Sequence, residues 1–236
     1  MGAGAAALPL IRIRELSKSY QRGGQQIPVL LDIHLDVMAG DFIALMGPSG
    51  SGKSTLLNLI AGIDQPSSGR IEIGGVDIAS LSEGQLADWR ARNVGFIFQF
   101  YHLLPELTAL ENVLSPKMIS DGVLKYWRNR REHRAEAERL LETVGLGHRL
   151  KHKPREMSGG EMQRAAIARA LITKPEVLLA DEPTGNLDRR TGQEILTLLR
   201  TLSDREKLTV VMVTHDLGIA EQADRVVSLV EGRVEH

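Results

Sequence analysis

The sequence contains no cysteine and no long apolar run, and its positive and negative charges nearly balance. The absence of cysteine excludes disulfides, thiolate catalysis and cysteine-ligated zinc. A membrane-spanning helix needs about 18 or more consecutive apolar residues, and no such run is present, so we expect no direct membrane span. The formal net charge is −1, so contact with nucleic acid or an anionic membrane would have to come from a local patch.

The first ten residues, MGAGAAALPL, are small and apolar but carry no positive charge. A secretory signal peptide begins with a positively charged region, so we interpret residues 1–9 as a disordered tail. The rest of the chain, residues 10–236, has the length and composition of one globular domain. A cytoplasmic protein is the default expectation.

Several nearly continuous apolar runs predict strands that are buried on both faces, as in a parallel sheet covered by helices. Patterns typical of helices follow them, and the alternation indicates α/β architecture. The predicted strands begin at Phe42, Val94, Val177 and Thr209, and the predicted helices span Lys53–Ala61, Glu161–Ile172 and Gly192–Leu202.

Two further regions differ from this core. The stretches Leu10–Tyr20, Val29–Val37 and Gly69–Ile78 predict an antiparallel sheet beside the main one. Tyr126–Val144 is a charged helical stretch with little apolar face, and we expect a helical subdomain inserted at about residues 105–154. Thr108 and Glu111 fit a capping box, which predicts that a helix of this subdomain begins near Thr108. The predicted fold is therefore a mainly parallel α/β core with an N-terminal antiparallel β subdomain and a helical insertion.

The segment GPSGSGKST fits the phosphate-loop pattern G-x-x-x-x-G-K-[ST] between a predicted strand and a predicted helix. Its glycines let backbone amides turn toward an anion, and the helix N-terminus adds partial positive charge. Lys53 is placed to reach the β- and γ-phosphates, and the Ser54 hydroxyl to ligate Mg²⁺. The alternative is an ordinary strand-to-helix turn. The predicted nucleotide-binding residues here are Gly47, Pro48, Ser49, Gly50, Ser51, Gly52, Lys53, Ser54 and Thr55.

Two acids end the predicted strand VLLADEP. A carboxylate at the end of a buried strand is costly unless it is paired or near a metal, so Asp181 fits the Mg²⁺-organising aspartate of a phosphate-loop ATPase. Glu182 can serve as general base for water. The alternative is a pair of solvated acids.

A second glycine-rich helix start, MSGGEMQR, occurs at Met157–Arg164. Ser158 and Glu161 fit a capping box, which explains those two residues but not the two consecutive glycines. Exposed amides at a helix start suit an anion, although the phosphate loop already provides such a site.

MSGGEMQR resembles the signature motif of the ATP-binding cassette (ABC) ATPases. The resemblance implies that Ser158, Gly159 and Gly160 bind the γ-phosphate of an ATP held by a second copy of the chain. Two copies would pack head to tail around two ATP molecules, which is an isologous arrangement. It also implies ATP hydrolysis in which Lys53, Glu182 and His215 are catalytic.

Other positions match the same family pattern in order along the chain. The resemblance implies that Tyr20 stacks on adenine, that Gln99 contacts Mg²⁺ and senses a membrane partner, and that His215 lies over the γ-phosphate. The implied metal ligands are Ser54, Gln99 and Asp181, and the loop Gly185–Asp188 would contact the other subunit. A strand-end tyrosine and a histidine satisfied by local contacts are the alternatives for Tyr20 and His215.

The stretch from Phe100 to Pro105, FYHLLP, resembles a branch of the family that works beside periplasm-facing membrane subunits, and most closely its lipoprotein-releasing (Lol) type. This implies integral membrane permease subunits of the Lol type as partners and a peripheral position on the cytoplasmic face of the bacterial inner membrane. Macrolide-export and cell-division (FtsE-type) ATPases are alternatives. A DNA-associated ABC ATPase is disfavoured because the chain lacks heptads, cysteine zinc modules and a basic footprint, so we expect no nucleic-acid partner.

Each of two further stretches is compatible with two interpretations. Leu103, Leu104, Leu107 and Leu110 form either a groove for a short helix of the membrane subunit or the local core of the insertion. The basic run Lys125–Arg134, KYWRNRREHR, either touches lipid headgroups or is a solvated helix face in which Glu132 and Glu136 pair with arginines.

Overall fold

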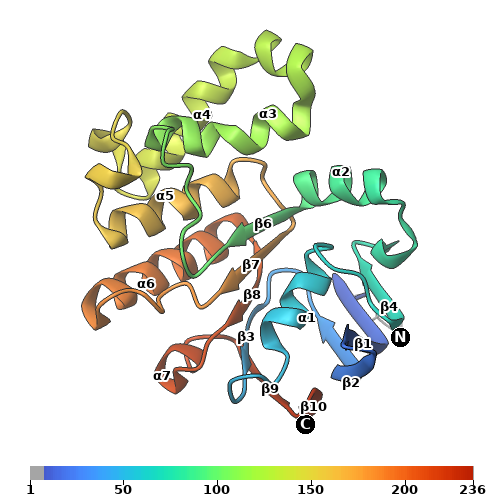
Figure 1. The fold of residues 1–236 in the computed structure, drawn as a ribbon. Coiled ribbons are helices and arrows are strands. Elements are labelled where there is room, and N and C mark those ends of the chain that lie inside the picture. The colour runs from blue at the N-terminus through green and yellow to red at the C-terminus, as the bar shows by residue number, and fades with distance from the viewer. Residues whose placement is uncertain (1–7, 236) are drawn as a thin grey trace, which may run out of the picture.

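A computed structural model describes residues 8–235, and most of the predicted N-terminal tail therefore lies outside the described residues. The described chain forms a six-stranded sheet in the order β10-β9-β3-β8-β7-β6 and a four-stranded sheet in the order β2-β1-β4-β5 (Figure 1). Strands β9, β3, β8, β7 and β6 pair in parallel, and β10 pairs antiparallel with β9 at the edge. The predicted α/β class with an additional antiparallel sheet is confirmed.

Three of the four strands predicted from apolar runs, β3, β8 and β7, lie side by side inside the large sheet, and the fourth, β6, is its edge strand. The three interior strands are almost fully buried, as expected of parallel strands with helices on both faces. Two strands near the C-terminus were not predicted, because their exposed positions interrupt the apolar pattern. The strands are β3 (Phe42–Met46), β6 (Val94–Ile97), β7 (Val177–Asp181), β8 (Thr209–Val213), β9 (Arg225–Val230) and β10 (Arg233–Glu235).

Three helices cover this sheet where the sequence pattern predicts them, α1 (Lys53–Ile60), α5 (Gly159–Leu171) and α6 (Arg189–Glu206). The short α7 (Leu217–Ala220) was not predicted. Helix α6 begins earlier than its apolar pattern because Asp188 caps it, accepting hydrogen bonds from the Arg190 and Thr191 amides at 3.1 Å.

The antiparallel sheet packs its apolar side chains onto α1 and one face of the large sheet, in a common core. Ile13 illustrates the register, since it pairs with Leu35 on one side and Ile71 on the other. The strands are β1 (Ile11–Arg22), β2 (Gln25–Val37), β4 (Ser68–Ile73) and β5 (Val76–Asp77).

The remaining helices are α2 (Glu83–Asn93), α3 (Ala109–Arg128) and α4 (Arg130–Thr143). Helix α3 begins at a capping box, in which Glu111 accepts a 2.8 Å hydrogen bond from the Thr108 amide, as predicted. It is interrupted at Gly122, where φ is +69°. Helices α3 and α4 stand together above the large sheet (Figure 1). Among residues 8–235, no helix combines the length and apolarity that a bilayer crossing requires.

Three short 3₁₀ turns complete the chain and carry it between these elements. They are η1 (Ile78–Ser80), η2 (Gly147–Arg149) and η3 (Pro154–Glu156). The last two connect α4 to α5, so η3 ends immediately before Met157, the first residue of the second glycine motif.

Candidate functional site

The predicted phosphate loop connects β3 to α1, and its backbone requires glycine. Gly47, Gly50 and Gly52 have φ of +149°, +79° and +102°, a region that side chains rarely tolerate. A Cβ atom on Gly47 would lie 2.0 Å from the Leu229 carbonyl oxygen. Gly52 is the N-cap of α1 and supplies no side-chain cap, so the first amides of α1 remain available to a ligand.

Lys53 lies inside this loop rather than in solvent. Its side chain is largely buried, and its ammonium group donates to the carbonyl oxygens of Gly47 at 2.9 Å and Pro48 at 2.8 Å. The buried Ser51 hydroxyl has no hydrogen-bond partner among the described residues. A buried ammonium group and an unsatisfied hydroxyl beside the start of a helix form a site with the chemistry to hold an anion.

Ser54 and Asp181 meet across the end of the sheet. The Ser54 hydroxyl donates to Asp181 Oδ1 at 3.2 Å, although 127 residues separate the two in sequence. Burial raises the pKa of Asp181, the nearby Glu182 charge adds to this, and the Ser54 hydrogen bond and Lys53 charge oppose it. Magnesium typically uses one or two carboxylates together with hydroxyl and water oxygens, so this pair fits the predicted metal site.

Glu182 follows β7 with a left-handed backbone, at φ of +44°. Its Oε1 lies 3.1 Å from Nδ1 of His215, which follows β8. Side chains rarely occupy this backbone region unless surrounding contacts impose it, and such strain is common at functional sites. Glu182 and His215 both line a pocket of about 410 Å³, together with residues of the loop Gly185–Asp188.

Gln99 reaches the same place from the loop after β6. A Cβ atom on Gly185 would lie 3.0 Å from Gln99 Nε2 and 3.2 Å from Glu182 Oε2, so both side chains border this glycine. The Asn186 side chain also donates to the Gln99 carbonyl at 2.7 Å. The structure therefore brings Gln99 beside Glu182, as the family pattern implies.

Tyr20 lies at the end of β1 with a ring that is 42% exposed. Its hydroxyl donates to Asp64 at 2.7 Å, and the Lys18 ammonium lies 4.8 Å from the ring centroid. Burial and the Asp64 hydrogen bond raise the pKa of Tyr20, whereas the Thr55 side chain lowers it. Tyr20 therefore lies beside Thr55, at the end of the phosphate loop, and is partly exposed to solvent.

The second glycine motif begins α5. Ser158 and Glu161 form the predicted capping box, with a 2.8 Å bond from the Ser158 amide to Glu161 and a 3.2 Å bond from the Glu161 amide to Ser158. The glycines also have a packing reason. A Cβ atom on Gly159 would lie 2.9 Å from the Tyr101 hydroxyl, and one on Gly160 would lie 2.6 Å from Thr191 Cγ2.

The start of α5 lies apart from the phosphate loop of the same chain (Figure 1). In the described part of the chain, Ser158 hydrogen-bonds only to residues of its own helix, Glu161 and Met162. The structure thus gathers Lys53, Ser54, Gln99, Asp181, Glu182 and His215 at one end of the sheet but not Ser158, Gly159 and Gly160.

Two positioning contacts were not predicted from sequence. The Gln163 side chain is fully buried and donates to the Pro183 carbonyl at 2.6 Å, which ties α5 to the residue after Glu182. Arg169 donates to the carbonyls of Tyr101 and His102, both of which have left-handed backbones. A polar residue on an otherwise apolar helix face was the only sequence signal for either contact.

A groove lies beside the loop that follows Gln99, but the four leucines considered from sequence do not line it. Leu110 is buried in the core, Leu103 packs against that core, and Leu104 is 49% exposed. The groove has a volume of about 370 Å³ and is formed mainly by α2, β6, α3 and α5. Its lining residues include Ala87, Ala91, Phe96, Phe98, Ile119 and Arg169.

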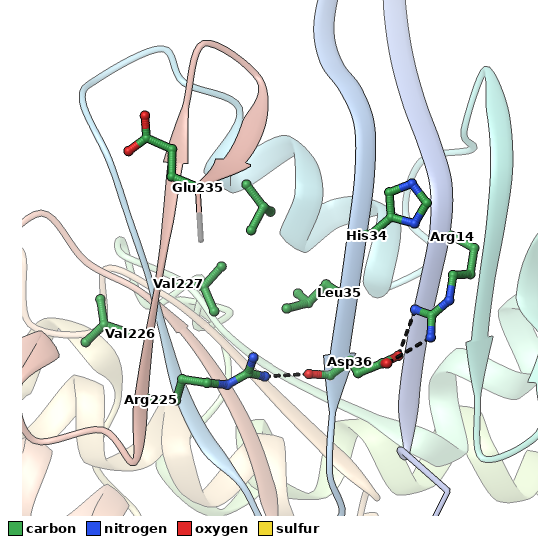
Figure 2. A pocket seen from close by; sticks show the side chains of 9 residues that line it. Arg14, His34, Leu35, Asp36, Arg225, Val226, Val227 and Glu235 are labelled. Atoms are coloured by element: carbon green, nitrogen blue, oxygen red, sulfur yellow. Dashed lines mark hydrogen bonds and ion pairs between the residues drawn. The ribbon is translucent and has the colours of Figure 1, made fainter.

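A separate pocket of about 470 Å³ lies between the antiparallel sheet and the β9–β10 edge (Figure 2). Its main charges are paired internally, because Arg14 binds Asp36 through two 2.8 Å hydrogen bonds and Arg225 donates to the Asp36 carbonyl. It contains none of the predicted site residues.

Comparison with known proteins agrees with this geometry. A family model described as "ABC transporter" matches residues 30–185. The lipoprotein-releasing system ATP-binding protein LolD 2 of Rhodopirellula baltica is 51% identical, over 96% of this chain and 89% of that protein. The macrolide export ATP-binding/permease protein MacB of the same organism is 50% identical, over 95% of this chain but 32% of that protein.

Among solved structures, a dimeric post-hydrolysis state of the ATP-binding cassette MJ0796, bound to ADP and Pi, matches with a TM-score of 0.85. It is 39% identical and is aligned over 96% of this chain and 97% of that one. These similarities confirm the resemblance drawn from MSGGEMQR and the predicted fold. The chain belongs to the ABC transporter family, as an ATP-hydrolysing cassette of the LolD-like type.

Proposed function

We propose that this ATPase acts as a head-to-tail dimer that drives release of lipoproteins from the inner membrane toward the outer membrane. The observation that carries the catalytic part is the line of contacts from Ser54 through Asp181 to Glu182 and His215 at one end of the sheet. The observation that carries the substrate is the similarity of about half of all residues to lipoprotein-releasing ATPases over nearly the whole chain.

In this proposal ATP is the substrate and Mg²⁺ the cofactor. The amides of Gly47–Thr55 and the Lys53 ammonium bind the phosphates, and the Tyr20 ring stacks on adenine. Ser54, Gln99 and Asp181 would hold Mg²⁺, which neutralises phosphate charge when bound. The raised pKa of Asp181 supports this, because a nearby cation would offset the burial of its carboxylate.

Glu182 orients and deprotonates the attacking water, and His215 holds that geometry from the end of β8. The 3.1 Å contact between the two side chains supports a shared role, since catalytic bases are commonly oriented by a neighbouring side chain within hydrogen-bond reach. Gln99 borders the same space, so movement of its loop would change the site. This is how a partner at the nearby groove could affect turnover.

Ser158, Gly159 and Gly160 act on the γ-phosphate of the second chain. Their separation from the phosphate loop supports this role, because one chain alone cannot bring the two motifs to one nucleotide (Figure 1). The similarity to a cassette whose structure is described as dimeric supports it further. Closure on ATP and opening after hydrolysis would then move the membrane subunits.

The partners in this proposal are integral membrane permease subunits of the Lol type, which hold the ATPase at the cytoplasmic face of the inner membrane. The groove formed mainly by α2, β6, α3 and α5 has a partly apolar lining, which supports docking of a short amphipathic helix of such a subunit. The similarity to MacB favours macrolide export as the second candidate function.

Glu182→Gln provides the test, because it should bind ATP without turnover and accumulate the closed dimer. We expect hydrolysis to fall by about 10²–10⁴-fold, the usual contribution of a positioned base. The tagged variant is purified with ATP and Mg²⁺ from detergent-solubilised membranes of the source organism, and the co-purifying proteins are identified by mass spectrometry. Lys53→Ala is the matched control that should not trap the dimer.

Recovery of a lipoprotein-releasing membrane subunit with the Glu182→Gln variant would support the proposal. Recovery of a macrolide-type or division-type subunit instead would overturn the substrate while leaving the ATPase chemistry intact. A Glu182→Gln protein that stays monomeric with ATP and hydrolyses it at nearly the normal rate would overturn the mechanism.

A further inference from the structure

The turn between α3 and α4 presents apolar side chains to solvent. We call residues 121–134 the α3–α4 tip, and it lies at the top of Figure 1, away from both sheets. After the interruption at Gly122, the side chains of Val123, Leu124 and Trp127 are 71%, 89% and 59% exposed. They share one side of a helical turn, so a compact apolar surface points away from the protein.

This outward orientation is fixed by contacts on the inner side of the turn. Tyr126 is buried and its ring stacks on that of His133, with 5.6 Å between centroids. Asp121 lies 2.9 Å from both the Lys125 ammonium and His133 Nε2. The Lys125 hydrogen bond and neighbouring positive charges lower the pKa of Asp121 despite its burial. The tip is therefore held in shape, and its apolar residues face outward because the inner positions are filled.

Arginines surround the apolar surface. A hollow of about 630 Å³ is lined by Trp127, Arg128, Asn129, Arg130, Arg131, Glu132 and Arg134. Arg134 pairs with Glu138 at 2.8 Å, whereas Arg128, Arg130 and Arg131 have no acidic partner among residues 8–235. The Arg130 guanidinium lies 5.1 Å from the centroid of the Trp127 ring. Residues 121–134 contain five Lys and Arg against two acids, in a chain whose net charge is −1.

We propose that the α3–α4 tip binds the surface of an anionic phospholipid bilayer, with Leu124 and Trp127 among the acyl chains and the unpaired arginines on lipid phosphates. Tryptophan beside arginine at an exposed apolar turn is the usual composition of an interfacial membrane contact. Free guanidinium groups match lipid phosphates, and each adds attraction to an anionic leaflet. Glu132 pairs with no arginine among the described residues, whereas Glu138 pairs with Arg134 and Glu136 with Arg139, so the salt-bridged face considered from sequence forms only in part.

The position of the tip agrees with this occupant. Ile119 lines the groove proposed for the membrane subunit, and Met118 and Ile119 are 52% and 75% exposed between that groove and the tip. When a membrane subunit occupies that groove, the tip surface that adjoins the groove faces the membrane. The direction of approach rests on the proposed function, but binding to a bilayer can be measured without any partner.

The full-length Trp89→Phe protein has Trp127 as its only tryptophan, which makes the test selective. Trp127 emission is recorded with vesicles of phosphatidylcholine alone and with vesicles that also contain phosphatidylglycerol. We expect a blue shift and co-sedimentation with the anionic vesicles only, and weaker binding at high salt. Inorganic phosphate alone should leave the emission unchanged.

Two sets of substitutions separate charge from apolar insertion. Replacing Arg128, Arg130 and Arg131 together by Gln should lower the partition coefficient at least about tenfold. Leu124→Ser should reduce the blue shift. The control for the arginine variant replaces Arg92, Lys151 and Arg205 by Gln, which removes the same charge elsewhere on the surface. The control for Leu124→Ser is Ile63→Ser, which removes another exposed apolar side chain. Neither control should change vesicle binding. All variants should keep ATPase activity and a normal circular dichroism spectrum.

Several outcomes would overturn the inference: no emission shift with anionic vesicles, equal binding by the control and tip variants, or a shift produced by phosphate alone. If the tip variants bind vesicles normally but lose a membrane subunit in detergent, the surface docks a protein and the lipid assignment is wrong. Recovery of a different membrane subunit with Glu182→Gln would change the proposed function without changing the vesicle result, so the two failures are distinguishable.

Discussion

The ionised form of Asp181 is less favourable in the folded chain than in water. Its carboxyl group is partly buried at the end of β7, with Glu182 beside it, and burial is the largest cause of its raised pKa. The Ser54 hydroxyl and the Lys53 ammonium offset this only in part. A carboxylate that destabilises the ligand-free protein but suits a bound cation is typical of sites that serve binding rather than stability.

Asp181→Asn should therefore stabilise the nucleotide-free protein at neutral pH while abolishing Mg²⁺-dependent hydrolysis. An acid whose pKa is raised on folding disfavours the folded state progressively as pH rises from its ordinary value of 3.8 through the folded-state pKa. The gain should be at most about 1 kcal/mol, because the group keeps solvent contact, which corresponds to roughly 2–4 °C in Tm.

The measurement is thermal unfolding of both proteins from pH 4 to pH 8, without nucleotide. The difference should shrink as the pH falls toward the ordinary pKa of aspartate and vanish below it, where the carboxyl group is protonated in both states. A lower Tm for Asp181→Asn throughout this range would contradict the interpretation. Asp204→Asn, at an exposed position on α6, is the control and should leave Tm unchanged.

At the scale of elements, α5 connects the second glycine motif to the catalytic end of the sheet. It begins at Ser158, crosses the sheet, and carries Gln163 inward to the Pro183 carbonyl. The Gln163 side-chain oxygen has no hydrogen-bond partner among the described residues. The only hydrogen bond of this buried side chain is therefore the one that its nitrogen donates to the Pro183 carbonyl. A shift of α5 would therefore be transmitted to the residue that follows Glu182.

Gln163→Leu should lower kcat by about tenfold to a hundredfold with little change in KM for ATP, because small displacements of catalytic groups have effects of that size. The phosphate loop is not touched by the substitution. Stability should fall by about 1–3 kcal/mol because the buried Pro183 carbonyl loses its donor.

Steady-state ATPase kinetics and thermal unfolding measure the two effects. Exposed Gln26→Ala is the control, and it should match the unsubstituted protein in both. A Gln163→Leu protein with lower stability but an unchanged kcat would show that the contact is only structural.

The sequence was sufficient for elements whose period or motif is local. Apolar runs located β3, β7 and β8, and the capping boxes at Thr108 and Ser158 located the starts of α3 and α5. It missed α2, where Leu86 is the only buried residue, and the strands β9 and β10, whose exposed positions break the pattern. Those elements depend on what packs against them, which no local pattern encodes.

In the candidate site, too, some features could be predicted from local sequence and others depend on the folded chain. Residues that belong to motifs, such as Lys53 and Glu182, could be named from sequence, and the structure brings them together. The contacts made by Gln163 and Arg169 could not, because each joins a side chain to a backbone carbonyl far away in sequence. Backbone carbonyls leave no mark in the sequence, so such contacts become visible only once the chain is folded.

At the scale of the whole molecule, the proposed function has the two glycine motifs act on one nucleotide from two copies of the chain. Lys53 lies in the phosphate loop at the start of α1, whereas Ser158 caps α5, whose start lies apart from that loop in the same chain (Figure 1). A two-fold axis places the phosphate loop of each copy opposite the second glycine motif of the other copy. The dimer then has two equivalent complete sites, although each chain alone has none. The dimer should then depend on ATP, because the nucleotide forms much of the contact between the copies.

Complementation between two inactive variants tests this arrangement. Lys53→Ala should lose phosphate binding in its own site, and Ser158→Arg should block the site of its partner; each alone should be inactive. In an equimolar mixture about half of the dimers are mixed, and one of their two sites carries neither substitution, so roughly a quarter of all sites are intact.

We therefore expect the mixture to recover on the order of a tenth to a quarter of normal ATPase activity, with both parents near background. Size-exclusion chromatography with ATP should show a mixed dimer, identified by a tag on one variant. Mixing Lys53→Ala with Glu182→Gln is the control. Both substitutions act on the site of their own chain, so every mixed site carries one defect and no activity should return. If a mixed dimer forms but no activity returns in the test mixture, Ser158 acts on the nucleotide of its own chain and the head-to-tail arrangement is wrong.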